Sequence, residues 1–79
     1  MNQKQFLVLA SKSFGVKTSK ISINLKLNEI EEWDSIGHLT LLSNLDKATK
    51  GKTSKIKGLG TQKSLKKIWD TLKRKGLVK

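Results

Sequence analysis

Three stretches of this chain repeat apolar residues at the spacing of an α-helix, and the chain contains no proline to interrupt them. The apolar residues of the first and last stretches are Phe6, Leu9, Ala10 and Phe14, then Leu65, Ile68, Trp69 and Leu72. Each set forms one stripe on a helix. We therefore predict a first helix from about Asn2 to Phe14 and a last helix from a cap at Thr61 to near Gly76. Stripes of this kind are buried against one another in a small helical bundle.

The middle stretch runs from Ser35 to about Lys50 and follows Asp34, a residue type that accepts hydrogen bonds at helix starts. At about 100° per residue, one broad arc of this helix is apolar and holds Leu39, Leu41, Leu42, Leu45 and Ala48. The polar residues on the other arc are Thr40, Ser43, Asn44 and Lys47. We expect the apolar arc to be buried and the polar arc to be free. His38 lies in the apolar arc, where a structural hydrogen-bonding role is favoured over a place beside a ligand.

Two connections join these helices. Between Val16 and Trp33, alternate positions are aliphatic, and these are Ile21, Ile23, Leu25 and Leu27. The alternation is typical of a strand, but a lone strand has no partner in this chain for its backbone groups, so we expect an extended loop under the helices. From Gly51 to Gly60 we expect at most one short helical turn. The predicted fold is a single all-α domain over residues 1–79, with three main helices, a short fourth helix or turn, and a long loop between the first two helices.

The charge is placed unevenly along the chain. Seventeen Lys and Arg against six Asp and Glu give a net charge of +11. Residues 1–45 carry five Lys and four carboxylates, a net of +1, whereas residues 46–79 carry twelve basic and two acidic groups, a net of +10. A segment of this kind attracts nucleic acid, an anionic membrane surface or an acidic protein, and the plain alternative is a solvated face.

Several chemistries are excluded by the residues present. Without cysteine there is no disulfide, no thiolate metal site and no cysteine nucleophile. The only histidine, His38, lies three residues after Ser35 on one exposed turn, so we expect no enzymatic activity. We expect no metal site, because neither the spacing nor the glycine of a calcium loop occurs around Glu29, Glu31, Glu32 and Asp34. The longest apolar run, Phe6 to Ala10, is too short for a membrane span or a signal peptide. We therefore expect a cytoplasmic protein without a transmembrane segment. We also expect it to be a monomer.

The tripeptide Asp34-Ser35-Ile36 begins the middle helix. A serine at the first helical position exposes its hydroxyl, and the free N–H groups and the positive end of the helix dipole favour a phosphate attached there. Ser35 is thus suited to modification by a phosphodiester. The tripeptide alone leaves an alternative open, in which Asp34 caps the helix and Ser35 has no further role.

The wider pattern resembles the acyl carrier proteins over nearly the whole chain. Its parts are Gly15-Val16-Lys17 after the first helix, a long loop with spaced aliphatic residues, and the run from Trp33 to Leu39 at the second helix. In that family an Asp-Ser-Leu motif carries a 4′-phosphopantetheine arm, derived from coenzyme A, on its serine, and here Ile36 replaces the leucine. The resemblance implies a carrier of acyl or aminoacyl groups, held as thioesters on an arm at Ser35 with Asp34 and Ile36 beside it. It also implies a phosphopantetheinyl transferase and acyl-loading and acyl-transfer enzymes as partners.

The charge of the chain also departs from the family, which is usually acidic, whereas this chain has a net charge of +11. The free face of the second helix is usually acidic in carriers, whereas here it is neutral to basic and consists of Thr40, Ser43, Asn44 and Lys47. If partners dock on this face, like charges would weaken binding by the enzymes that serve acidic carriers. We therefore expect dedicated partner enzymes with neutral or acidic docking surfaces.

The alternative function is a basic helical module that binds nucleic acid. Its phosphate contacts would come from the last helical segment, at Lys63, Lys66, Lys67, Lys73, Arg74 and Lys75. Only one arginine is available for bidentate contacts to bases, so we expect no binding to a specific nucleic-acid sequence.

Overall fold

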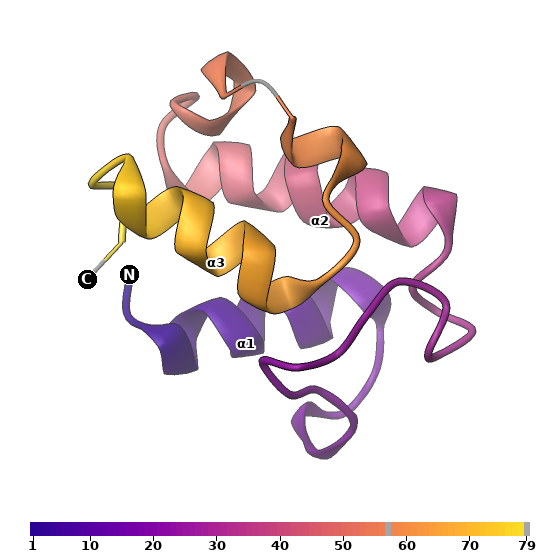
Figure 1. Ribbon diagram of the computed structural model, residues 1–79. Coiled ribbons are helices and arrows are strands. Elements are labelled where there is room, and N and C mark those ends of the chain that lie inside the picture. The colour runs from indigo at the N-terminus through magenta and orange to yellow at the C-terminus, as the bar shows by residue number, and fades with distance from the viewer. Residues whose placement is uncertain (57, 79) are drawn as a thin grey trace.

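The computed structural model describes residues 1–56 and 58–78, and in this part of the chain three α-helices surround one core (Figure 1). The helices are α1 (Gln3–Phe14), α2 (Ser35–Ala48) and α3 (Leu65–Arg74). Three short 3-10 turns lie in the connections, and they are η1 (Thr18–Lys20), η2 (Thr53–Lys55) and η3 (Leu59–Thr61). The predicted all-α fold with a long loop between its first two helices is confirmed. Lys57 and Lys79 of the basic segment lie outside the described residues.

Local sequence explains the ends of α1. Asn2 and Gln5 form a capping box, in which each side chain accepts a hydrogen bond from the other residue's backbone N–H, at 2.8 and 2.9 Å. The helix ends at Gly15, whose φ of 71° is a left-handed conformation that glycine adopts at little cost. The predicted bounds of this helix are therefore confirmed.

The core combines side chains from all three helices and from the loop before α2. Its largest fully buried members are Trp33, Phe6, Leu41, Leu45, Leu65, Ile68 and Leu72. The rings of Phe6 and Trp69 lie 5.3 Å apart at an angle of 41°, which joins α1 to α3. Full burial of one such side chain contributes roughly 1.5–3 kcal/mol, so these contacts dominate the stability of the bundle.

The buried face of α2 differs from the predicted arc. Leu41 and Leu45 are buried as expected, but Leu39 is 67% exposed and Ala48 is also exposed. The remaining buried positions of the helix are Gly37 and His38. The buried face is rotated towards these two residues because the loop before α2 lies against them, and helical periodicity alone cannot show where a loop lies.

The loop between α1 and α2 finds a backbone partner, contrary to the sequence prediction. The N–H of Leu27 donates to the carbonyl of Lys63 at 2.8 Å, and the N–H of Leu65 donates to the carbonyl of Leu25 at 3.0 Å. These bonds flank a single antiparallel bridge between Lys26 and Ser64. Apart from this bridge and the short turn η1 the loop is irregular, and it buries Ile21 and half-buries Ile23, Leu25 and Leu27.

The sequence prediction was wrong in two details of the connection between α2 and α3. It contains two 3-10 turns, η2 and η3, where at most one was expected. The cap of α3 is Ser64, whose hydroxyl accepts from the N–H of Lys67 at 3.1 Å. Thr61 instead ends η3 and donates to the carbonyl of Gly58 at 2.9 Å. The bridge to Lys26 fixes the backbone at Ser64, and this contact decides which of the two candidate caps is used.

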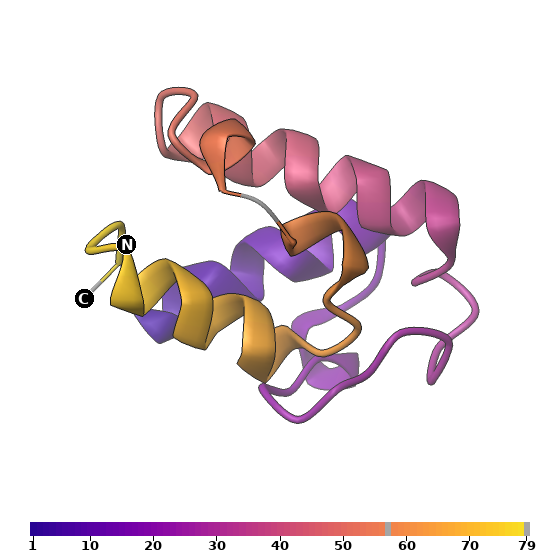
Figure 2. The ribbon, with the colours of Figure 1, turned by 45° about the horizontal axis from the view of Figure 1, so that its top comes forward.

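The helices are short, and α2 is the longest with 14 residues. Within residues 1–56 and 58–78, none is long and apolar enough to cross a membrane. The two ends of the chain lie side by side in both ribbon views (Figures 1 and 2), and the start of α2 lies at the opposite end of the bundle.

Candidate functional site

Asp34 caps the start of α2, as predicted. Its carboxylate accepts a hydrogen bond from the N–H of Gly37 at 2.9 Å, and its carbonyl accepts from the N–H of His38 at 2.8 Å. A cap of this kind contributes about 1 kcal/mol and sets the residue at which the helix begins. Ser35 is therefore held at the first helical position.

The side chain of Ser35 is exposed, and so is that of Ile36 at 74%. The N–H groups of these two residues lie in the first turn, where the helix supplies no carbonyl to accept from them. Together with the helix dipole, they form an environment that favours a negative group attached to the Ser35 oxygen. The structure thus brings Asp34, Ser35 and Ile36 together in the predicted arrangement.

Trp33 and His38 hold the loop against this helix start. The buried indole of Trp33 stacks on Phe14, with ring centres 5.1 Å apart, and its N–H donates to Nδ1 of His38 at 3.1 Å. Nε2 of His38 lies 3.3 Å from the carbonyl oxygen of Leu59. The structural hydrogen-bonding role predicted for His38 is confirmed, and its ring has two polar partners.

Gly37 lies where the backbone of the loop passes close to the first turn of α2. A Cβ atom built on Gly37 would overlap the backbone carbonyl oxygen of Glu32. Only glycine therefore allows the loop to pass so near the first turn of the helix. The sequence analysis assigned Gly37 no role, although a glycine inside a predicted helix usually signals such a contact.

A groove of about 280 Å³ adjoins Ser35. We call it the Ser35 groove, and its lining consists of Leu27, Ser35, His38, Leu39, Leu42, Gly60, Gln62 and Lys63. These residues come from the long loop, from α2 and from the connection to α3. Leu27 and Gln62 were not predicted as site residues, and Lys63 was predicted only as a phosphate contact for nucleic acid, because only the folded chain brings the three beside α2.

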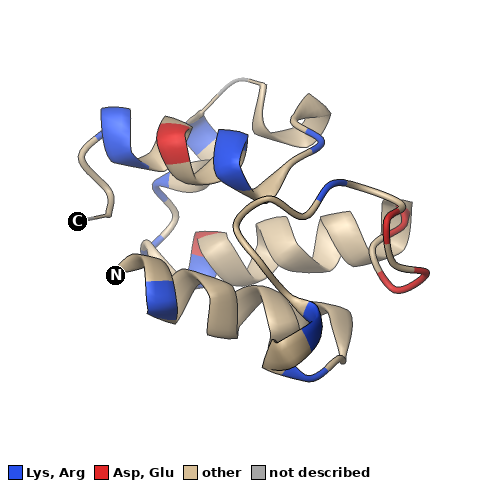
Figure 3. Ribbon diagram, turned by 60° about the horizontal axis from the view of Figure 1, so that its bottom comes forward, with Lys and Arg blue, Asp and Glu red and all other residues tan. Residues whose placement is uncertain are grey.

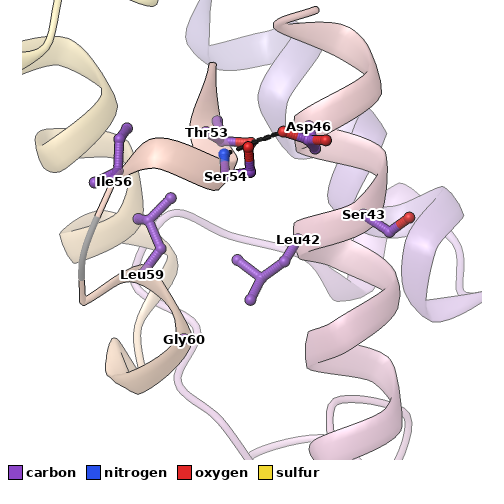
Figure 4. Close-up of a pocket in the computed structure, with 8 residues that line it drawn as sticks. All are labelled: Leu42, Ser43, Asp46, Thr53, Ser54, Ile56, Leu59 and Gly60. Atoms are coloured by element: carbon purple, nitrogen blue, oxygen red, sulfur yellow. Dashed lines mark hydrogen bonds between the residues drawn. The ribbon is translucent and has the colours of Figure 1, made fainter. Parts of the chain in front are cut away.

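A second groove of about 360 Å³ continues along α2 and shares Leu42 and Gly60 with the first (Figure 4). At its far end, one carboxylate oxygen of Asp46 accepts from the N–H of Ser54 at 3.1 Å and from the hydroxyl of Thr53 at 3.3 Å. These bonds tie η2 to the end of α2, and residues of both elements line the second groove.

The predicted docking face is present in part. Thr40, Ser43 and Lys47 are exposed on α2. Asn44 is half-buried, and its amide donates to the hydroxyl of Ser13 on α1 at 2.8 Å. Asn44 therefore belongs to the contact between α1 and α2, because it lies on the edge of α2 that faces α1. Leu39, which was predicted to be buried, is exposed instead, and it lies on α2 close to Ser35.

The charges around the site are also arranged by the fold. Figure 3 shows the acidic residues of the loop at the end of the bundle where α2 begins, whereas basic residues mark the end of α3. The exposed carboxylates next to Ser35 are those of Glu31, Glu32 and Asp34. Ser35 thus lies between these carboxylates and Lys63 of its groove, and Lys47 is exposed about three turns further along α2.

No group of three or more residues able to hold a metal ion occurs within the described part of the chain. Comparison of the sequence and the fold with models of protein families, with characterised proteins and with solved structures found no significant match.

Proposed function

We propose that this protein is a carrier of acyl or aminoacyl groups, which are held as thioesters on a 4′-phosphopantetheine arm attached to Ser35. The observation that carries the proposal is the exposed hydroxyl of Ser35 at the first position of α2, behind the Asp34 cap. The resemblance of the motif and of the helix order to acyl carrier proteins supports the same assignment.

The residues around Ser35 fit such an arm. The first-turn N–H groups favour its phosphodiester, and Lys63, which lines the same groove, adds a positive charge. Leu27, Leu39 and Leu42 provide an apolar surface beside the attachment point. The thiol that carries the cargo belongs to the arm, so the lack of cysteine in this chain does not conflict with the proposal.

The chain's own contribution is to present and orient the attachment point. Trp33, His38 and Gly37 hold the loop and the helix start together, while Ser35 and Ile36 remain exposed to an approaching enzyme. Partner enzymes would perform the loading and the transfer. Thr40, Ser43 and Lys47 favour partners whose surfaces are neutral or acidic at that point.

Intact-mass spectrometry tests the proposal. After incubation with coenzyme A and a broad-specificity phosphopantetheinyl transferase, we expect the mass to increase by one phosphopantetheine group. Ser35→Ala should abolish the increase, whereas Ser43→Ala, which removes another exposed hydroxyl from the same helix, should not. No increase in the unsubstituted protein, or an increase that survives Ser35→Ala, would contradict a carrier function.

A second candidate is non-specific binding of nucleic acid, and the outer face of α3 favours it. This helix buries Leu65, Ile68 and Leu72 and exposes Lys66, Lys67, Lys73 and Arg74. Asp70 is exposed on the same helix and reduces its positive charge. A surface of this kind attracts phosphates without reading bases.

A further inference from the structure

Exposed basic side chains gather at the end of the bundle opposite Ser35. Residues that follow α2 and residues that follow α3 line one cleft there, which has a volume of about 260 Å³. Both ends of the chain lie at this end of the bundle, whereas α2 begins at the other (Figures 1 and 2). We call this surface the basic end, and its exposed basic residues are Lys47, Lys50, Lys52, Lys73, Arg74 and Lys75.

The charge of the basic end is largely unbalanced. The carboxylate of Asp46 already accepts two hydrogen bonds from η2, and Asp70, one turn before Arg74 on α3, offsets one charge. A basic residue in the last turn of a helix interacts favourably with the helix dipole, but this effect falls off beyond that turn. It therefore does not account for Lys50 and Lys52, which follow α2. A surface of this kind attracts polyanions.

Two features of the molecule favour a membrane over nucleic acid as the polyanion. The four aromatic residues of the chain, Phe6, Phe14, Trp33 and Trp69, are buried. No aromatic ring is therefore available to stack on the bases of a single strand. The cleft of the basic end is lined by Met1, Ala48 and Leu77 as well as by Lys50 and Lys52. Apolar side chains beside lysines suit a bilayer surface, where charged headgroups adjoin hydrocarbon.

We propose that the basic end binds the surface of a membrane that contains anionic lipids, through electrostatic attraction and without a spanning helix. The exposed carboxylates of Glu31, Glu32 and Asp34 lie at the opposite end (Figure 3), and the same lipids repel them. This polarity orients the bound molecule so that Ser35 faces away from the bilayer and stays accessible. The proposal goes beyond the carrier function and does not depend on it, because it involves neither Ser35 nor its groove.

Cosedimentation with lipid vesicles tests the proposal. Vesicles of phosphatidylcholine and phosphatidylglycerol in equal parts are anionic, whereas vesicles of phosphatidylcholine alone carry no net charge. We expect the protein to bind the first and not the second, and the binding to weaken as the salt concentration rises. Lys52→Gln with Lys75→Gln should lower the partition coefficient roughly thirtyfold, about fivefold for each lysine near the surface.

A matched pair of lysines separates the basic end from the net charge of the chain. Lys17→Gln with Lys20→Gln removes the same charge from exposed positions that follow the end of α1. This variant should retain most of the binding to the anionic vesicles. All four substitutions are at exposed positions, so we expect both variants to fold, and circular dichroism checks this.

The orientation of the bound protein is measured with one polarity-sensitive fluorophore, since the chain contains no cysteine. The fluorophore is attached through Ala48→Cys at the basic end or through Ser35→Cys at the opposite end, and both positions are exposed. On addition of the anionic vesicles, we expect its emission to move to shorter wavelength at position 48 and to stay unchanged at position 35.

Four results would overturn the proposal. No binding to the anionic vesicles at low salt would exclude a membrane as the partner. Equal losses of binding in the two lysine pairs would show that net charge, and not the basic end, is responsible. An equal emission shift at position 35 would contradict the orientation. Complete release from the vesicles by a DNA duplex containing the same amount of phosphate would assign the basic end to nucleic acid. Since none of these measurements involves phosphopantetheine, their failure is separate from a failure of the carrier function.

Discussion

The indole N–H of Trp33 donates a hydrogen bond to Nδ1 of His38 across 3.1 Å, in a buried part of the molecule. An indole N–H can only donate, so Nδ1 carries the lone pair and Nε2 carries the proton. Nε2 can then donate to the carbonyl of Leu59, 3.3 Å away. His38 thereby connects the loop before α2, α2 itself and η3. All three segments contribute residues to the lining of the Ser35 groove, and the loop leads directly to Ser35.

Trp33→Phe should therefore destabilise the protein by more than the loss of apolar area explains. It leaves the buried Nδ1 of His38 without a donor, which costs about 1–3 kcal/mol. The matched control is Trp69→Phe, which makes the same change in a buried indole that packs on Phe6 and makes no hydrogen bond to the described residues. Urea denaturation measures both. Equal losses of stability in the two variants would show that the Trp33–His38 bond contributes nothing.

Gly37→Ala should destabilise the protein although alanine favours helices. Its Cβ would overlap the carbonyl of Glu32, and relief of that overlap requires the loop to move, at a cost of about 1–3 kcal/mol. Gly60→Ala is the control, because a Cβ there meets no atom within 4 Å. Its effect should stay within about 0.5 kcal/mol. Thermal denaturation compares the two, and equal stability of both variants would contradict the observed approach of the loop.

The double variant Lys47→Glu with Thr40→Glu should lower the rate of acyl transfer by the cognate partner enzyme roughly tenfold at low salt. The reason is that the charge on the exposed face of α2 changes from positive to negative. The same double variant should be recognised better by enzymes that serve acidic carriers. Gln3→Glu with Lys4→Glu makes matched changes at exposed positions of α1. Transfer rates at low and moderate salt provide the measurement. An unchanged preference would place docking elsewhere, for example on the loop from residue 16 to 33.

Binding to nucleic acid should be weak, with dissociation constants of about 10⁻⁴–10⁻⁶ M at physiological salt, and insensitive to sequence. Lys66→Ala and Arg74→Ala should each reduce the slope of log affinity against log salt by about one if those residues contact phosphates. Fluorescence anisotropy with several DNA and RNA sequences measures both properties. Tight binding to one sequence that depends on Lys66 or Arg74 would favour the nucleic-acid module over the carrier.

Much of the fold could be predicted from the sequence, because the relevant signals involve residues close together in the chain. The start of α1 depends on a capping box between Asn2 and Gln5, and the start of α2 on Asp34 and Gly37, three positions away. Ser35 could be placed at the first position of α2 for the same reason. The cap of α3 was assigned to Thr61 when Ser64 supplies it, since both residue types suit a cap and a contact with the distant Lys26 decides between them.

Other features of the site depend on contacts between distant residues. Asn44 and Ser13 are 31 positions apart, and only the packing of α2 on α1 removes Asn44 from the free face. The exposure of Leu39 depends in the same way on where the loop and η3 cover α2.

The sequence by itself determined three helical stripes, the glycine that ends α1, the cap before Ser35 and the unequal charge of the two halves. Periodicity, capping and composition depend on neighbouring residues and remain readable without a fold. The tertiary structure alone decided which arc of α2 is buried and which side chains line the Ser35 groove. It also decided that Gln62 and Lys63 lie beside α2 in that groove. Burial and hydrogen-bond partners there are set by segments that meet only when the chain is folded.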